Sequence, residues 1–241
     1  MRETLKWLIF CLLIVNFVPA TRGVAEERIF FEENFNDLVA WTPLTFSRIA
    51  KHSQFSIAEI ESKRVLALKA SASASAIVFS KKFNPAEYPI LKWEWRVDQL
   101  GISRDPREKD GDDYPVRVFV LFEYDPNAAT LWEKAKYQTA KMRFGKYPPK
   151  ATLNYVWTSS EGGNLVNYPS PYTDSAQIIV KDRGSEFLGQ WRHHEVDIYN
   201  DYEKAFGQSV PSSATIAVMA DADDTDSQSL SYIDFLSASK R

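Results

Sequence analysis

Cysteine and histidine are almost missing from this chain of 241 residues, which has one cysteine and three histidines. Cys11 lies in an apolar run near the N-terminus, so a chain that lost this run would have no disulfide, thiol nucleophile or cysteine-based zinc site. His193 and His194 are adjacent in a predicted strand, so they point to opposite faces and cannot bind one metal together. With only 9 glycines and 12 prolines, the sequence is also not collagen-like or of low complexity.

An excess of positive charge and the familiar catalytic motifs are lacking as well. The 29 lysines and arginines are outnumbered by 32 aspartates and glutamates, so no broad basic field exists for a phosphate backbone. We therefore expect no nucleic-acid partner. The absence of G-x-S-x-G, H-E-x-x-H, P-loop and G-x-G-x-x-G motifs removes the usual support for a serine hydrolase, a zinc protease or a nucleotide enzyme.

The first 25 residues have the layout of a secretory signal peptide. Arg2 and Lys6 precede an apolar run over 7–18, and small residues over 23–25 precede two glutamates. The run is too short to span a bilayer comfortably. We expect cleavage after Ala25 and a periplasmic or secreted product, 26–241, without a membrane span; an uncleaved N-terminal anchor is the alternative.

Short apolar or alternating segments follow from Glu26 onward, at intervals of about ten residues, as is typical of β-sandwiches. In 91–98 the alternation is strict, with Leu91, Trp93, Trp95 and Val97 on one face. We predict an all-β fold: one jelly-roll-like (concanavalin- or galactose-binding-like) two-sheet β-sandwich over 26–241. The predicted strands are 28–35, 55–60, 65–70, 76–83, 91–98, 116–124, 152–157, 176–181, 191–198, 215–220 and 231–236.

Two short helices are predicted as insertions in this pattern. Thr130 and Glu133 have the spacing of a capping box, and Gly145 can end a helix over 131–144. Asn200 and Gly207 similarly bound a shorter helix over 201–206.

An acidic loop lies between two strong predicted strands. Its carboxylates, Asp110, Asp112 and Asp113, could converge on a calcium ion, or two of them could divide acid and base roles on a glycan. The alternative is a solvated loop whose charges pair with one another.

A second acidic loop follows the apolar run 216–219. Its candidate metal ligands are Asp221, Asp223 and Asp224. An EF-hand would have glycine at the sixth and glutamate at the twelfth position, where this chain has Asp226 and Tyr232. Calcium is thus the one cofactor considered, at a site of another geometry.

Aromatic and polar residues on nearby segments complete the candidate ligand site. Flat apolar rings suit sugar faces as well as protein cores. The candidates are Arg117, Asn154, Tyr155, Trp157 and Tyr172, together with the first acidic loop. For the two aromatic residues of 152–157, packing in a core is the alternative.

Several segments, taken in order, carry a family resemblance. They are LKWEW at 91–95, KDGDD at 109–113 leading to Arg117, LNYVW at 153–157, the predicted helix with Asp201 and Tyr202, and DADDT at 221–225. Together, over about residues 28–236, the sequence resembles the bacterial secreted family catalogued as domain of unknown function 3047. The resemblance implies a signal-bearing, jelly-roll-like domain and brings no activity with it.

These observations predict an exported β-sandwich that binds a carbohydrate or similar extracytoplasmic ligand, or a cell-envelope component, without catalysis. One alternative is a glycan-active lyase or hydrolase that uses aspartates of the two acidic loops. The other is a structural envelope protein whose acidic loops bind calcium or each other.

Overall fold

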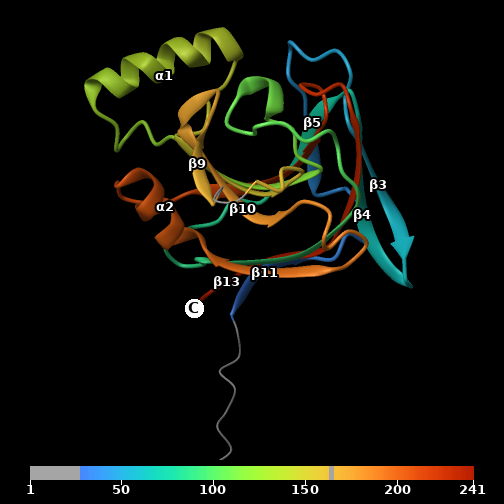
Figure 1. Cartoon of the computed structure of the whole chain (residues 1–241). Coiled ribbons are helices and arrows are strands. Elements are labelled where there is room, and N and C mark those ends of the chain that lie inside the picture. Colours follow the sequence, from blue (N-terminus) through green and yellow to red (C-terminus); the bar gives the residue numbers. More distant parts are fainter. Residues whose placement is uncertain (1–27, 163–165) are drawn as a thin grey trace, which may run out of the picture.

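The computed structural model describes residues 28–162 and 166–241, so the predicted signal peptide, 1–25, lies outside the described residues. The described chain forms two β-sheets with two α-helices at the periphery (Figure 1). This confirms the predicted jelly-roll-like β-sandwich with two helical insertions. Within the described part, no helix has the length and apolar character needed to cross a membrane.

The first sheet has six strands, all paired antiparallel. Their order is β11-β6-β13-β4-β3, and β1 pairs with β13. Their bounds are β1 Ile29–Glu33, β3 Gln54–Ile60, β4 Lys63–Ser71, β6 Ile90–Gln99, β11 Arg192–Asp197 and β13 Gln228–Ser239.

The second sheet has seven strands, in the order β2-β5-β12-β7-β8-β10-β9. All pairs are antiparallel except β8 with β10. Their bounds are β2 Trp41–Leu44, β5 Ala74–Phe79, β7 Val116–Phe122, β8 Ala151–Thr158, β9 Asn167–Ser170, β10 Thr173–Arg183 and β12 Ala214–Asp221.

The core lies between the two sheets. The alternating residues of β6 that were expected on one face, from Leu91 to Val97, are fully buried there. The second sheet contributes Val118 and Val120 of β7 and Ile216 of β12 to the same core. Burial of this apolar surface is the main favourable term for the fold.

Helix α1 spans Leu131–Phe144, as predicted. Thr130 and Glu133 form the expected capping box, and Gly145 ends the helix in the left-handed conformation. Helix α2 spans Ile198–Phe206 and begins three residues earlier than predicted, because the Asp197 side chain accepts a hydrogen bond from the backbone N–H of Asn200.

Two short strands, β2 and β9, were not predicted from the sequence. Each has four residues and contains a proline, so neither shows a clear alternation. A short 3₁₀ turn, Lys109–Gly111, occurs in the first acidic loop.

Candidate functional site

The outer face of the seven-stranded sheet carries two contrasting sets of side chains. In β7, the even-numbered residues enter the core, so Arg117, Phe119 and Leu121 lie on the opposite face. In the neighbouring strand β12 the same alternation places Met219 and Asp221 on that outer face. Because the strands are antiparallel, Arg117 and Asp221 meet at one end, and mostly apolar residues cover the rest.

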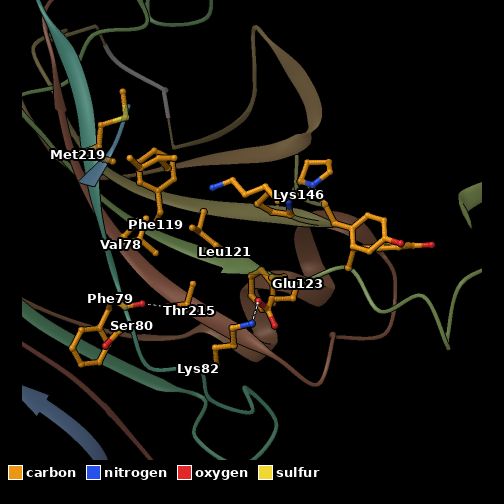
Figure 2. Close-up of a pocket in the computed structure, with 18 of the residues that line it drawn as sticks. Val78, Phe79, Ser80, Lys82, Phe119, Leu121, Glu123, Lys146, Thr215 and Met219 are labelled. Carbon is orange, nitrogen blue, oxygen red and sulfur yellow. Dashed lines mark hydrogen bonds and ion pairs between the residues drawn. The ribbon is translucent and has the colours of Figure 1, made fainter. Parts of the chain in front are cut away.

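An open groove of about 850 Å³ lies over the apolar part of this face (Figure 2). Four neighbouring strands, β2, β5, β12 and β7, supply its floor. The floor residues are Leu44, Val78, Phe119, Leu121, Ala217 and Met219.

One wall of the groove is the segment 146–149 that follows α1. Three tyrosines fix this wall to the helix and the sheet. The ring of Tyr124 stacks on Tyr137 of α1, with centroids 3.7 Å apart, and Tyr147 packs edge-on against Tyr124 at 5.2 Å. The Tyr147 hydroxyl also donates a hydrogen bond of 3.0 Å to Gln138 Oε1.

The polar end of the groove is built around Glu123. Its Oε1 lies 2.6 Å from Lys82 Nζ (Figure 2). Its Oε2 accepts a hydrogen bond of 2.7 Å from the Ser213 hydroxyl. Burial alone would raise the pKa of Glu123, but Lys82 and Ser213 outweigh it and lower the pKa. Glu123 is therefore ionised at neutral pH.

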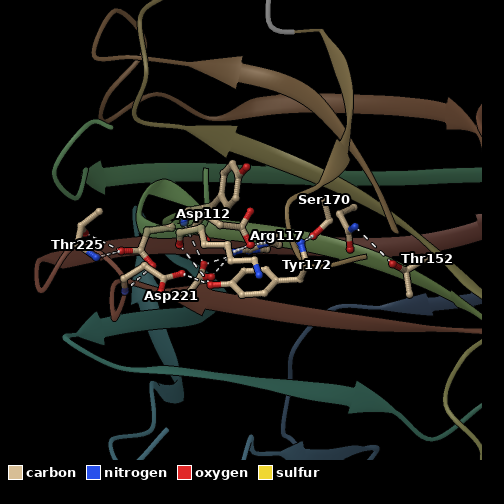
Figure 3. Close-up of polar contacts among 12 residues, drawn as sticks. Asp112, Arg117, Thr152, Ser170, Tyr172, Asp221 and Thr225 are labelled. Atoms are coloured by element: carbon tan, nitrogen blue, oxygen red, sulfur yellow. Dashed lines mark hydrogen bonds and ion pairs between the residues drawn. The ribbon is translucent and has the colours of Figure 1, made fainter. Parts of the chain in front are cut away.

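At the other end of the face, Arg117 is buried among carboxylates (Figure 3). Its Nε donates to Asp221 Oδ1 at 3.0 Å, and its Nη2 contacts Asp221 Oδ2 and the backbone carbonyl of Asp112. The backbone N–H of Tyr114 also donates to Asp221 Oδ1, at 3.0 Å. We call Asp112, Asp113, Asp221, Asp223 and Asp224 the aspartate cluster.

The two acidic loops meet in this cluster. Asp113 Oδ2 accepts hydrogen bonds of 2.6 Å from both the backbone N–H and the hydroxyl of Thr225. The Tyr172 hydroxyl donates to Asp224 Oδ2 at 2.9 Å. Sheet order explains the meeting, because β7 begins beside the end of β12.

The aspartate cluster contains more negative charge than Arg117 can balance. Asp112, Asp113 and Asp221 are all buried, and a carboxylate oxygen from each of Asp113, Asp221 and Asp223 lies within 4.8 Å of the others. Burial opposes the charge of Arg117 as well, but Asp112 and Asp221 outweigh it and raise the pKa of the guanidinium well above its usual value.

The pKa values of four carboxyls in the cluster are raised too, which in their case favours the neutral form. Burial raises the pKa of Asp221 to about 8, despite the attraction of Arg117. Burial also raises the pKa values of Asp112, Asp223 and Asp224. Asp221 therefore holds a proton near neutral pH unless a cation offsets its charge.

The structure separates the other predicted ligand residues. Asp110 is exposed and pairs with Arg104 at 3.4 Å. Asn154 lies on the outer face of β8, where its side-chain amide donates to the backbone carbonyl of Gln177 at 3.1 Å. Neither residue lines the groove.

Tyr155 and Trp157 require a correction, since both are fully buried in the core rather than facing a ligand. In β8 the side chains of the odd-numbered residues point into the core, so the rings of Tyr155 and Trp157 point there too. The Tyr155 hydroxyl donates to Asp201 Oδ2 at 2.9 Å, and Trp157 Nε1 donates to the backbone carbonyl of Gly184 at 3.1 Å.

The groove was not predicted from the sequence, although the residues of β7 contain a signal for it. Its sequence, VRVFVLF, has apolar residues at both phases of the alternation. A strand with one face in water would instead alternate apolar and polar residues.

A comparison with protein-family models matches residues 39–236 to a family described as "Protein of unknown function (DUF3047)". The chain belongs to this family. This confirms the resemblance carried by the sequence motifs. Curated protein sequences give no match to this DUF3047 chain.

Solved structures similar to this DUF3047 chain include a xyloglucanase and a lectin. The family 12 xyloglucanase from Bacillus licheniformis is 6% identical, with 89% of this chain and 99% of that chain covered and a TM-score of 0.45. The lectin from Bauhinia forficata in complex with GalNAc is 11% identical, with 90% and 99% covered and a TM-score of 0.37.

A third similar structure is the enzymatically active domain of tailspike protein 4 of bacteriophage CBA120. It is 7% identical, with a TM-score of 0.37, and the match covers 84% of this chain but 20% of that chain. Likenesses this weak carry no argument about function.

Proposed function

We propose that this protein binds a carbohydrate, without catalysis, in the groove on the outer face of the seven-stranded sheet. The observation that carries the proposal is the pairing of a broad apolar floor with a charged end inside one open groove. Because residues 1–25 predict export, the ligand would be periplasmic or extracellular, such as a free glycan or a glycan of the cell envelope.

The chemistry of a sugar ring matches this arrangement. A pyranose presents a C–H face that packs on apolar surface and hydroxyl groups at its edge that need polar partners. Phe119 and Leu121 offer the apolar surface, while Glu123 offers carboxylate oxygens. Ligand sites in general combine a mostly apolar lining with a few placed polar groups.

Catalysis in the groove is not part of the proposal. A glycan hydrolase of the common kind needs two carboxyl groups at the scissile bond, one of them protonated. Among the described residues that line the groove, Glu123 is the one carboxylate, and its lowered pKa keeps it ionised. It could accept a hydrogen bond from a sugar hydroxyl but could not serve as the general acid.

Calorimetric titration with soluble oligosaccharides of glucose, xylose, mannose and N-acetylglucosamine tests the proposal. We expect saturable heat with at least one of them, and a loss of about tenfold in affinity in Glu123→Gln, because a charged acceptor is replaced by a neutral one. Glu59→Gln, on the exposed side of β3, is the matched control. No heat with any sugar, or equal losses in both variants, would contradict the proposal.

We also propose that the aspartate cluster binds calcium as a structural ion. Three neighbouring carboxylates, with Asp112 beside them, exceed the single positive charge of Arg117. Carboxylate oxygens are the preferred ligands of calcium. The ion would join the two acidic loops, which corresponds to the structural alternative raised by the sequence.

Thermal unfolding with calcium or a chelator tests this second proposal. Saturating calcium should raise the melting temperature, by an amount equivalent to about 2.7 kcal/mol at a hundredfold excess over Kd. The shift should disappear in Asp223→Asn and persist in Asp226→Asn, which changes an exposed carboxylate of the same loop. An equal melting temperature in calcium and chelator would rule the ion out.

A further inference from the structure

Helix α1 presents an apolar stripe to solvent. The exposed fractions of Leu131, Trp132 and Met142 are 87%, 73% and 74%. With 3.6 residues per turn, these side chains fall on one face together with Ala135, Gln138 and Thr139, which are also exposed, so the stripe is apolar chiefly at its two ends. The less exposed residues of the helix lie on the opposite face, toward the protein: Glu133, Tyr137 and Ala140.

Lysines border this stripe on both sides. At helical spacing, Lys134 and Lys141 lie along one edge, and Lys136 lies along the other. Lys136 Nζ is 5.8 Å from the ring centroid of Trp132, so positive charge directly adjoins the apolar surface. Within the described part of the chain, none of these three lysines forms a salt bridge.

The segment that contains α1 is rich in positive charge and poor in negative charge. Between positions 131 and 150 the sequence has six basic residues and one acidic residue, although the whole chain has a net charge of −3. A uniformly solvated surface would not require such a separation of charge. The segment therefore has charge complementary to an anionic surface.

The helix is firmly held, so its exposed stripe is a feature of the fold. The capping box at Thr130 fixes its start, and Gly145 ends it. The stacked pair of Tyr124 and Tyr137 attaches its middle to the sheet. In Figure 1, α1 lies at the edge of the molecule, far from β3, where a flat surface could reach it.

We propose that α1 docks on the surface of an anionic lipid bilayer. Apolar residues with tryptophan on one face of a helix, with lysines beside them, suit a position at the boundary between headgroups and acyl chains. A soluble polyanion would pair with the lysines but leave the apolar stripe in water. Docking would place the groove wall, 146–149, next to the membrane, and it does not depend on what the groove binds.

Vesicle co-sedimentation of the full chain tests the proposal, with phosphatidylcholine vesicles that contain or lack phosphatidylglycerol. We expect binding that requires phosphatidylglycerol and weakens as salt rises. Lys134→Gln/Lys136→Gln/Lys141→Gln should reduce affinity on the order of a hundredfold, at about fivefold per charge. Leu131→Ser/Trp132→Ser should reduce it about tenfold or more, from lost apolar burial.

Matched controls separate α1 from general effects. Lys51→Gln/Lys69→Gln/Lys81→Gln removes the same charge elsewhere, and Val39→Ser removes an exposed apolar side chain that is not on α1. Both should bind as the unsubstituted chain does. Residues 1–25 are common to every variant, so differences report on α1.

Three results would overturn the proposal. One is equal binding with and without phosphatidylglycerol, and another is equal binding by the α1 variants and their controls. The third is failure to sediment with vesicles together with lysine-dependent binding to heparin, which would assign the helix to a soluble polyanion.

Discussion

The groove and the aspartate cluster lie on the same face of the same two strands, yet they treat charge in opposite ways. At the groove end, Glu123 pairs with Lys82 and keeps a lowered pKa. At the cluster end, burial raises the pKa of Asp221 to about 8, even though Arg117 contacts it directly. The sheet is one scaffold, but the number of carboxylates per cation differs.

This difference suggests that the aspartate cluster serves the stability of the fold and that the groove serves binding. Buried charges contribute to stability only while each remains compensated. The fold should therefore be sensitive to any change in the cluster, whereas the open groove can be altered at little cost in stability.

Removal of the positive charge of Arg117 should have the largest effect on stability. Arg117→Met would leave Asp112 and Asp221 buried without their partner, so we expect a loss of about 3–5 kcal/mol in the free energy of unfolding. Arg107→Met is the control, because Arg107 pairs with Asp105 on the surface. Urea-induced unfolding measures both. Equal stability of the two variants would contradict the account of the cluster.

Asp182 is a buried carboxylate that, unlike the aspartate cluster, has enough hydrogen-bond and charged partners to stabilise its negative charge. It accepts a hydrogen bond of 2.7 Å from Trp95 Nε1, and Arg192 Nε and His194 Nε2 lie 3.1 and 2.6 Å from its oxygens. Burial would raise its pKa, but His194 and its other partners lower it below 3.8. The folded state thus holds the proton less tightly than the unfolded state.

The sign of the pH dependence follows from this lowered pKa. The stability that Asp182 contributes is complete above the unfolded value of 3.8 and is lost as pH falls through the folded value. Asp182→Asn should therefore be less stable at neutral pH and lose less further stability in acid. Unfolding measured from neutral pH downward tests this, and parallel acid limbs for variant and unsubstituted chain would refute it.

The groove wall rests on α1, whose start depends on Thr130. Thr130→Ala removes the side-chain acceptor for the Glu133 N–H and should cost about 1 kcal/mol. Hydrogen exchange should locate the loss in the first turn of α1. In contrast, Thr139→Ala, in the helix interior, should leave exchange in that turn unchanged. Equal exchange rates in the two variants would show that the capping box does not hold the helix.

The smallest effect on stability is expected in the groove itself. Leu121→Trp adds volume toward open space rather than into the core, so its free energy of unfolding should change by about 0.5 kcal/mol or less. Urea-induced unfolding beside Val39→Trp, at an exposed position, provides the comparison. A loss as large as that of Arg117→Met would show that the two ends of the face do not differ.

Local patterns in the sequence predicted most of the fold. The alternation in β6 and the capping box of α1 each depend on neighbouring residues, and both appeared as expected. Which face of β8 carries Tyr155 and Trp157 depends on how β8 pairs with β7 and β10. This pairing cannot be read from the local sequence. The meeting of the two acidic loops likewise depends on β7 and β12 being neighbours.

The groove was beyond prediction for a related reason. Its floor comes from four strands that are far apart in the chain, and its wall comes from the segment after α1. Among the strands that form the groove floor, only β7 has an unusual composition. Only the sheet order brings these residues to one surface.

The central claim is that the groove binds a carbohydrate, and calorimetric titration of Leu121→Trp tests it most directly. The indole should obstruct the part of the floor beside Phe119 and weaken binding of the best oligosaccharide by about tenfold, while Val39→Trp should bind as the unsubstituted chain does. Undiminished binding by a folded Leu121→Trp variant would contradict the account.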